Sequence, residues 1–466
     1  MDSGLLKPRA AAGARILPRS LSRIPWLRGL FYSRWPVFLA RAVTLAGFVL
    51  TIFAGLFGSV VGSQNFAIIF VWIAWWTLLK LVFIPLGGRS WCAVCPIPMP
   101  GEWITQRSIF PGVGKRFGLA LKWPKKIGPI PTSGAWMQGF GFLMIGLFSA
   151  VTLTSPRLTG WVLLALFAAA TLMAVLFEGG EKNYADRRAF CNHICPIGGF
   201  TGLYAPAAPV EVRVDDRAIC AAHAEKTCYQ ACPWGVYVTS LQDNGPCGMC
   251  FECVRVCPSD NVSVNLRSFG KDFITSRRIP RLDEAFLSLV MLGCALAFSA
   301  VFLGPWGALR RAAYAVGTPE WAVYGAGFLA FTGLLLPGLY AAAVKLGGPA
   351  PDLRKAAARF ARPLQPLGLA AWIAFTISFA FAKISYVLPV ISDPFGLGWD
   401  LFRTSSIVFN PDVSLISPIL QSAVLLGGML WTGRIAQREA DTPRRAMALQ
   451  GFALLFTLGM LVLLIG

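Results

Sequence analysis

Residues 247–258 read Cys247-Gly-Met-Cys250-Phe-Glu-Cys253-Val-Arg-Val-Cys257-Pro258. The spacing C-x2-C-x2-C-x3-C-P is that of bacterial two-cluster ferredoxins, in which three thiolates on one tight loop surround a cluster and the fourth, before the proline, binds the other cluster. A zinc knuckle or a disulfide framework is the competing interpretation. It fits poorly, because zinc sites use two pairs of ligands and not a quartet closed by Cys-Pro. The stretch therefore predicts iron–sulfur binding and electron transfer.

A second cysteine run lies upstream and is one thiolate short. Cys220, Cys228 and Cys232, followed by a proline, fit the pattern C-x2-C-x4-C-x3-C-P, except that His223 stands where the second cysteine belongs. If His223 is a ligand, its neutral imidazole makes the cluster less negative and raises its reduction potential, as in Rieske centres. A three-iron cluster with an empty corner, or a ligand from elsewhere in the chain, is the alternative.

Together the two runs supply the ligands of two [4Fe–4S] clusters. In the crossed arrangement one cluster takes its ligands from the end of the first run and most of the second, namely Cys232, Cys247, Cys250 and Cys253. The other cluster takes Cys220, Cys228, Cys257 and, as the open fourth position, His223.

The composition indicates an integral membrane protein. Of the 466 residues, 56% are hydrophobic and only 14% are charged, and the mean hydropathy is +0.61, values typical of polytopic membrane proteins. Nine stretches are long and apolar enough to cross about 30 Å of hydrocarbon as helices: 36–58, 65–86, 135–155, 159–178, 284–305, 318–342, 366–390, 412–432 and 446–466. We expect an all-α polytopic membrane protein of about nine transmembrane helices, with an inserted cytoplasmic two-cluster ferredoxin-like domain.

The distribution of charge predicts the orientation of the chain in the membrane. The formal net charge is +20, and 35 of the 42 Lys and Arg residues lie in five segments, 1–35, 87–134, 179–283, 343–365 and 433–445. This alternation follows the positive-inside rule and predicts an inner-membrane protein with a cytoplasmic N-terminus and an external C-terminus. The cysteine motifs then lie on the reducing side. The basic residues report topology and contact with the lipid bilayer, so no nucleic-acid partner is expected.

Two more cysteine pairs follow the second and the fourth predicted helix. They are Cys92-Ala-Val-Cys95-Pro and Cys191-Asn-His-Ile-Cys195-Pro, each preceded by arginine, a small residue and an aromatic residue, and they read as one repeated unit. The four thiols could hold a third cluster or another metal, or either pair could cycle between dithiol and disulfide. Packing of the cysteines at helix ends is the plainer alternative. His193, inside the second pair, is not expected to be a ligand.

Paired helices, a Cys-Pro pair after each, and a two-cluster ferredoxin module resemble the membrane-bound polyferredoxins of nitrate and nitrous-oxide respiration, the NapH and NosR type. The resemblance covers roughly residues 36–265. It implies electron transfer between a quinone pool and partner redox subunits. Three departures limit it: the first pair is C-x2-C-P, His223 replaces a cysteine, and four or five further spans follow the module. A large extracytoplasmic flavin-binding domain of the NosR kind is not expected.

Histidine usage excludes haem as a second electron carrier. The chain has two histidines, His193 and His223, both inside cysteine motifs, so bis-histidine haem within the helices cannot be built. The sequence contains no C-x-x-C-H motif, which excludes covalent c-type haem.

Ionisable residues in the predicted helices are candidates for quinone chemistry. Lys383 and Tyr386 lie late in the seventh stretch, close to further polar residues at Asp393, Asp400, Arg403 and Gln421. A quinone site needs a proton acceptor beside an apolar slot. The favoured interpretation is that Lys383 extends to the outer surface. Lys80 and Arg41 are likewise expected to extend to the membrane surface, or snorkel, at the cytoplasmic boundary. Cys294 is expected to be a small core residue.

We therefore expect four domains: a basic N-terminal arm (1–35), a four-helix membrane domain with the two Cys-Pro pairs (36–200), a two-cluster ferredoxin-like domain (205–270) and a C-terminal membrane domain of about five helices (284–466). The expected function is that of an electron-transfer subunit of a quinol-linked oxidoreductase complex. The alternative is a membrane redox sensor or a maturation factor in which the Cys92/Cys95 and Cys191/Cys195 pairs handle copper or thiols. A transporter is a third class, and no motif supports it.

Overall fold

The protein is mostly helical in the computed structural model, which describes residues 19–110, 112–132, 134–180, 186–223, 225–278, 281–407 and 416–465. Within these residues eight helices are long and apolar enough to cross a membrane, which identifies an all-α polytopic membrane protein. They are α2 (Trp35–Phe57), a helix of α and π segments (Phe66–Gly87), α10 (Pro156–Phe177), α16 (Leu282–Phe302), the α18–α19 helix (Pro319–Leu346), the α20–α21 helix (Leu353–Phe381), α23 (Ile416–Glu439) and α24 (Pro443–Ile465).

Three of these helices are composite. The second runs through α3 (Phe66–Ile68), η3 (Ile69–Trp75), α4 (Trp76–Leu78), η4 (Leu79–Phe83) and α5 (Ile84–Gly87). The fifth contains α18 (Pro319–Ala330), η8 (Phe331–Leu335) and α19 (Leu336–Leu346), and the sixth contains α20 (Leu353–Phe360), η9 (Arg362–Leu364) and α21 (Gln365–Phe381). The beginning of the predicted stretch 412–432 lies outside the described residues, as do residues 1–18 of the predicted N-terminal arm.

The predicted span 135–155 is not one continuous helix. It is broken at Phe148 into α8 (Ala135–Leu147) and α9 (Ser149–Thr152), so by length it is not counted among the eight. The hydroxyl of Ser149 donates to the Gly146 carbonyl at 2.8 Å, and that of Thr152 donates to the Phe148 carbonyl at 3.1 Å. Such side-chain bonds to the preceding turn compete with the helical pattern and bend helices.

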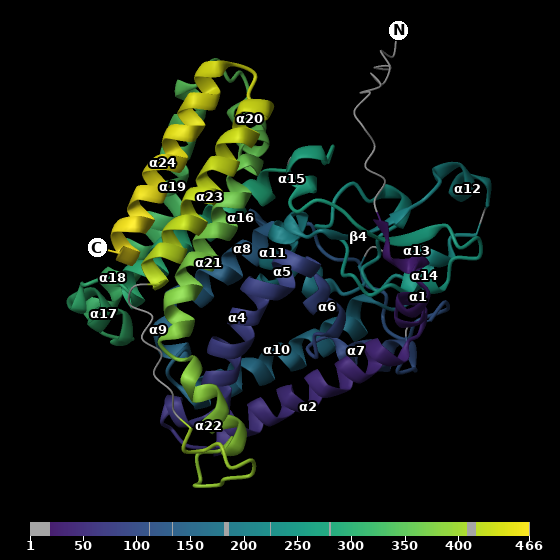
Figure 1. Ribbon diagram of the computed structural model, residues 1–466, viewed down its shortest axis with the longest axis horizontal. Helices are drawn as coiled ribbons and strands as arrows, with labels where there is room; N and C mark the ends of the chain where they lie inside the picture. Colours follow the sequence, from purple (N-terminus) through teal and green to yellow (C-terminus); the bar gives the residue numbers. More distant parts are fainter. Residues whose placement is uncertain are drawn as a thin grey trace.

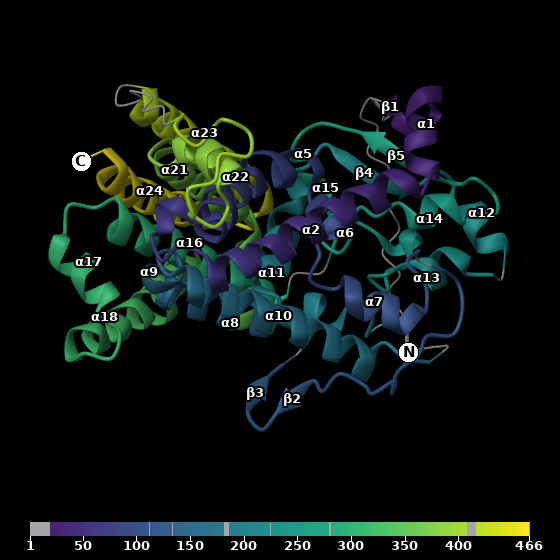
Figure 2. The same ribbon diagram turned by 90° about the horizontal axis from the view of Figure 1, so that it is seen from below.

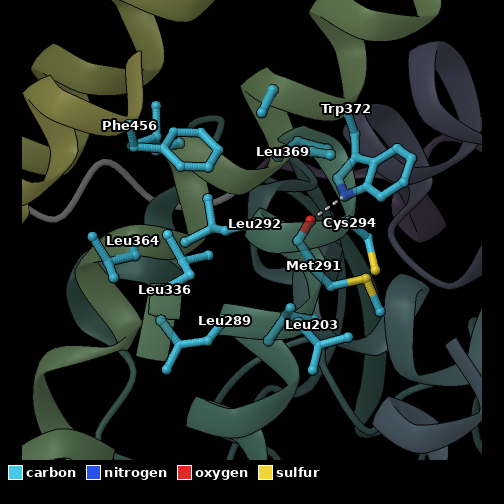
Figure 3. Packing of buried hydrophobic residues seen from close by; sticks show 14 of the residues in the cluster. Leu203, Leu289, Met291, Leu292, Cys294, Leu336, Leu364, Leu369, Trp372 and Phe456 are labelled. Atoms are coloured by element: carbon cyan, nitrogen blue, oxygen red, sulfur yellow. Dashed lines mark hydrogen bonds between the residues drawn. The ribbon is translucent and has the colours of Figure 1, made fainter. Parts of the chain in front are cut away.

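The membrane helices pack around a core that Figure 3 shows from close by. The indole N–H of Trp372 on α21 donates to the Met291 carbonyl of α16 at 3.1 Å, and Cys294 lies beside this bond. Cys294 is fully buried, as predicted for a small core residue. Two further bonds connect α21 and α23, since Gln421 donates to the Ala374 carbonyl and to the Ser378 hydroxyl.

Residues 205–278 form a smaller mixed region. Its antiparallel sheet has the order β1-β5-β4, with β1 (Arg19–Ser20) from the N-terminal segment, β4 (Val210–Val214) and β5 (Val262–Leu266). Short helices complete it: η6 (Ala205–Ala207), α12 (Arg217–Ala222), α13 (Thr227–Ala231), η7 (Val238–Ser240), α14 (Glu252–Arg255) and α15 (Lys271–Thr275). Helix α1 (Pro25–Tyr32) packs on this region, with Phe31 and Phe251 in edge contact at 5.0 Å.

Figure 1 shows α19, α23 and α24 together at one end of the molecule and α12, α13 and α14 at the other, and the turned view in Figure 2 keeps this separation. Between them Figure 1 shows α6 (Ser90–Val94), α7 (Met99–Gln106) and α11 (Pro196–Tyr204), and η5 (Phe190–Ile194) packs against α11. The remaining elements are η1 (Leu21–Arg23), η2 (Gly62–Gln64), β2 (Lys126–Ile127), β3 (Ile130–Pro131), α17 (Gly307–Tyr314), η10 (Ile384–Tyr386) and α22 (Val387–Ser392).

The predicted snorkelling of Lys80 and Arg41 is wrong. Lys80 is fully buried among helices, and Arg41 is 5% exposed and pairs with Glu102 of α7. Hydropathy marks a helix as apolar but does not say which of its faces neighbouring helices cover, so the two side chains could not be told from residues at a lipid boundary. Lys383, for which the same behaviour was favoured, is exposed.

Candidate functional site

Four cysteines, here called the inner group, gather around the loop that ends in α14. Burial raises the pKa of the Cys250 thiol, and the neighbouring thiols of Cys232 and Cys247 raise it further. Burial likewise raises the pKa of Cys253, with Cys247, Cys250 and Cys232 adding to the effect. Met249 and Phe251 have φ of 52° and 62°, and these two left-handed residues wrap the loop tightly. The inner group contains the four residues that the spacing assigns to one cluster.

Three further cysteines, the outer group, lie next to the inner one. Burial raises the pKa of the Cys228 thiol, and Cys257 and Cys220 add to it. Asn261 holds two of the three sulfurs: its backbone N–H donates to Cys257 Sγ and its side-chain amide donates to Cys220 Sγ, both at 3.3 Å. Hydrogen bonds to cluster sulfurs tune reduction potentials. The sequence analysis did not single out Asn261.

His223 follows α12, close in sequence to the outer group. Its Nδ1 lies 2.6 Å from the carbonyl oxygen of Glu225, so Nδ1 carries the proton and donates it to this bond. In the neutral imidazole, this bond leaves Nε2 as the unprotonated nitrogen. Histidines that bind metals commonly present one nitrogen to the metal while the other donates to a backbone carbonyl. The side chain therefore has the tautomer that a ligand needs, and its ligation stays a prediction.

The two Cys-Pro pairs come together in a third cluster of thiols, the Cys-Pro group, made of Cys92, Cys95, Cys191 and Cys195. Burial raises the pKa of Cys95, and Cys92 and Cys195 raise it further. Cys95 ends α6 and Cys195 ends η5, each directly before a proline. The backbone N–H of Gly198 donates to Cys195 Sγ at 3.3 Å, and the Thr201 hydroxyl lies 3.4 Å from Cys92 Sγ.

Among the described side chains no three histidines, cysteines or carboxylates already converge as a metal site. The chemistry of the groups nevertheless fits soft-metal ligation. Buried thiols that raise one another's pKa resist deprotonation. A bound cation reverses this effect, because it compensates the negative charge of the coordinated thiolates. Backbone N–H groups already point at Cys232, Cys257 and Cys195. Thiolate sets of this kind suit iron–sulfur clusters, zinc or Cu(I).

An arginine–tryptophan stack joins the Cys-Pro group to the inner group. The guanidinium carbons of Arg89 and Arg188 lie 4.1 Å and 4.7 Å from the ring centroid of Trp234, which follows Cys232 by two residues. Arg89 donates to the Gly245 carbonyl at 3.0 Å, and Arg188 donates to the Cys92 carbonyl at 2.7 Å. These are the arginines of the repeated unit, and the fold brings both to one ring.

Arg188 interacts with thiols of both the Cys-Pro group and the inner group. Burial disfavours its charge, yet the Glu102 carboxylate outweighs burial and holds the pKa of Arg188 above its usual range, and the sulfurs of Cys191 and Cys250 add to this effect. Cys191 belongs to the Cys-Pro group and Cys250 to the inner group. Arg188 is thus one buried cation that interacts electrostatically with thiols of the Cys-Pro group and of the inner group.

Buried ion pairs, which the sequence analysis did not identify, hold Arg188 and its neighbours in position. Glu102 pairs with Arg188 and Arg41; burial raises the pKa of its carboxyl, but the two arginines outweigh this effect and hold that pKa at about 2. Glu178 accepts the backbone N–H of Arg188 at 2.8 Å and pairs with Arg116 at 3.0 Å. Burial raises the pKa of Glu178 to about 7, against the opposing effect of Arg116.

A polar cavity of about 340 Å³ lies between the Cys-Pro group, the inner loop and the membrane helices. Gly198 and Gly202 of α11 line one side, and Gly245, two residues before Cys247, lines another. Arg89 is also a lining residue, and two of its nitrogens, Nε and Nη2, are buried without a hydrogen-bond partner among the described atoms. Arg278, Arg281 and Arg362 line the cavity as well, so it can offer hydrogen bonds to a ligand with acceptor oxygens.

His193 lies apart from these contacts. Its ring stacks on Trp123 with centroids 4.8 Å apart and planes 6° from parallel. Neither ring nitrogen has a hydrogen-bond partner in the described part of the chain.

Fold and site together define an integral membrane protein with cysteines gathered into buried groups. It is similar to the ferredoxin-type protein NapH of Haemophilus influenzae, with 28% identity over 212 residues, which are 39% of this chain and 63% of NapH, less than two thirds of that protein. An uncharacterized protein of Methanocaldococcus jannaschii is 22% identical over 236 residues, 49% of this chain and 82% of the relative. No protein-family model and no solved structure matches the chain.

Proposed function

We propose that this protein relays electrons through three iron–sulfur centres, one in each thiol group, between a quinone pool and redox partner proteins. The observation that carries the proposal is the single connected set of thiols. Cys228 of the outer group lies in a buried apolar cluster against which Cys247 and Cys253 of the inner group pack. Cys232 of the inner group packs against the buried cluster that contains Cys92 and Cys191 of the Cys-Pro group. Electrons can thus pass from the outer group to the inner group and on to the Cys-Pro group, or in the reverse direction.

The clusters, when bound, supply one-electron transfer, and the chain supplies their surroundings. Cys92, Cys191 and Trp234 share one buried apolar cluster, against which Cys195 and Cys232 also pack, and this packing excludes water. Arg89 and Arg188 place positive charge where reduction adds negative charge, which favours the reduced state. The similarity to NapH, a ferredoxin-type protein, supports the same assignment.

The proposal includes the organisation of the chain. Residues 205–270 form the inserted two-cluster ferredoxin-like domain on the cytoplasmic side, and the C-terminus lies outside. This requires nine crossings, with the broken α8–α9 segment as the third. The charge supports it: without that crossing, the basic segment 179–283 would lie outside, against the positive-inside rule.

The quinone part of the proposal is supported by the polar cavity. It lies where α8, α16 and α21 begin, and it borders both α11 of the Cys-Pro group and the inner loop. A quinone ring has two acceptor oxygens, and the guanidinium groups of Arg278, Arg281 and Arg362, which line the cavity, are donors that can meet them. Glu284, a carboxylate lining the same cavity, can accept a proton from a quinol.

The test is reduction of the purified protein, in lipid nanodiscs under anaerobic conditions, by a short-chain quinol. We expect bleaching of the visible iron–sulfur absorption by the quinol in the parent protein, at least tenfold slower bleaching in Cys195→Ser, and a normal rate in Cys294→Ala, whose cysteine belongs to none of the groups. If dithionite bleaches the parent protein and the quinol does not, the quinone assignment is wrong. Bound copper or a reversible disulfide at the Cys-Pro group would instead favour the maturation factor.

A further inference from the structure

Lys80 is a buried ionisable residue in the membrane region that the proposed relay does not use. It is fully buried in the second membrane helix, and its Nζ has no hydrogen-bond partner among the described atoms. Three aromatic rings face it instead: Nζ lies 4.8 Å from the ring centroid of Trp76, 5.3 Å from that of Trp372 and 5.4 Å from that of Phe375. Ring faces attract an ammonium group but compensate its charge only in part. Whether Nζ holds a proton therefore depends on the charge nearby.

The backbone around Lys80 is unusual. Lys80 lies in the π-helical segment η4, and a second π segment, η3, precedes it in the same helix. Such segments widen a helix by one residue per turn and occur often at functional sites. They are a second, independent sign that this helix is built for more than crossing the membrane.

The cage of Lys80 is in contact with the Cys-Pro group. Helix α6, which carries Cys92, packs against η4. Phe200 of α11 lies 5.3 Å from Trp76 and 5.5 Å from Trp372, centroid to centroid, so it touches two walls of the cage. The next residue, Thr201, lies 3.4 Å from Cys92 Sγ. A charge added at the Cys-Pro group therefore acts on Lys80 across a short, apolar and weakly screening stretch.

The other ionisable groups near the cage are few. Tyr204 on α11 is buried with its hydroxyl unpartnered among described atoms, Cys294 lies on α16, and Cys92 lies on α6. Asp283 and Glu284 lie in the first turn of α16, about three turns from Cys294, and pair with Arg281 and Arg278, respectively. The described residues of α4, α5, α8 and α21 contribute no ionisable side chain. Lys80 is thus the basic group that these packed helices offer to a proton.

We propose that Lys80 is a redox-linked proton-binding site: it takes up one proton when the centre in the Cys-Pro group is reduced and releases it on oxidation. This rests on the proposed function, because it needs a redox centre there. The electron comes from the inner cluster and adds one negative charge to the Cys-Pro centre. The proton comes from water and converts the neutral Nζ amine to ammonium, so no net charge is buried. A cavity of about 30 Å³, lined by Trp76, Phe375 and Ser149, has room for one water beside the cage.

The test is a redox titration of the Cys-Pro centre, followed by electron paramagnetic resonance in lipid nanodiscs at several pH values. In the parent protein the midpoint potential should fall as the pH rises. Lys80→Met, which carries no charge, should give a pH-independent potential near the parent's alkaline value. Lys80→Arg, which keeps its charge throughout, should give a pH-independent potential near the parent's acid value. Lys383→Met, which alters an exposed lysine, should keep the parent's pH dependence.

The two substitutions move the potential in opposite directions, a result that damage to the fold would not produce. Iron content equal to the parent's confirms that each variant is intact. A pH dependence that survives in both Lys80 variants overturns this inference and leaves the relay standing. A parent protein without a paramagnetic centre in the Cys-Pro group overturns both.

Discussion

Arg188 connects more parts of the site than its place in the sequence suggests. It pairs with Glu102, donates to the Cys92 carbonyl and stacks on Trp234, while its own backbone N–H donates to Glu178. Breaking a buried ion pair by removing one partner costs about 3–5 kcal/mol, because the remaining charge is left without compensation. Substitution of the residues around Arg188 should therefore change the stability of the protein and its reduction potentials.

At Glu178 the consequence is a dependence of stability on pH. Burial raises the pKa of this carboxyl from 4.5 to about 7. The folded state thus binds a proton that the unfolded state releases near pH 4.5, so the contribution of Glu178 to stability is greatest below that pH and is lost as the pH rises through about 7. We expect a loss of up to about 3 kcal/mol between pH 5 and pH 8, seen as a falling melting temperature in nanodiscs.

The matched variants decide whether Glu178 is the cause. Glu178→Gln cannot lose a proton and should flatten this dependence, whereas Glu320→Gln, at an exposed position, should leave it intact. An unchanged slope in Glu178→Gln would show that another group titrates.

His223 gives a prediction about a single cluster. Replacing it with cysteine adds a thiolate to the outer group and should lower the potential of that cluster, because a thiolate carries a charge that an imidazole lacks. The potentials of the other two centres should not move. A redox titration followed by electron paramagnetic resonance measures all three, and an unchanged outer potential in His223→Cys removes His223 from the ligand set.

Among the elements, the loop that carries Cys247 and Cys250 depends on a close approach to Trp234. A Cβ at Gly248 would lie 1.7 Å from Trp234 Nε1 and 2.4 Å from its Cε2, so Gly248→Ala must push the loop away from the arginine–tryptophan stack. We expect loss of the inner cluster, about four irons per chain. Gly112→Ala, where the added atom meets nothing within 4 Å, is the control. Full iron content in Gly248→Ala would show that the loop does not bind a cluster in this position.

The elements also show what a sequence can and cannot predict. Ligand spacing is local, so the cysteine runs and the repeated Arg-x-x-Cys unit could be found by pattern alone. The roles of Glu102, Asn261 and Arg41 could not be found in this way. Each of these residues acts through contacts between segments far apart in the chain, and such contacts produce no recognisable spacing in the sequence. The break at Phe148 accompanies hydroxyl bonds of Ser149 and Thr152 to the preceding turn, and the burial of Lys80 depends on neighbouring helices. Hydropathy describes neither.

For the whole molecule, the count of crossings determines on which side each centre lies. If α8–α9 crosses the membrane, a reporter fused after Thr154 is external, one fused after Gly348 is cytoplasmic and one fused after Arg403 is external. A fusion after Ser133, which lies outside the described residues, should be cytoplasmic. A cytoplasmic signal after Thr154 would place the basic segment 179–283 and two of the thiol groups on the outer side, contradicting the proposed orientation.

The central claim is that the chain holds three metal centres of one kind. The most direct measurement is iron and acid-labile sulfide per chain on anaerobically purified protein, with electron paramagnetic resonance of the oxidised and dithionite-reduced forms. Three four-iron clusters predict about twelve irons, or about eleven with an oxidised three-iron signal if the outer group lacks a fourth ligand. About eight irons, with zinc or copper in place of the third cluster, would contradict the claim and leave the Cys-Pro group outside the electron path.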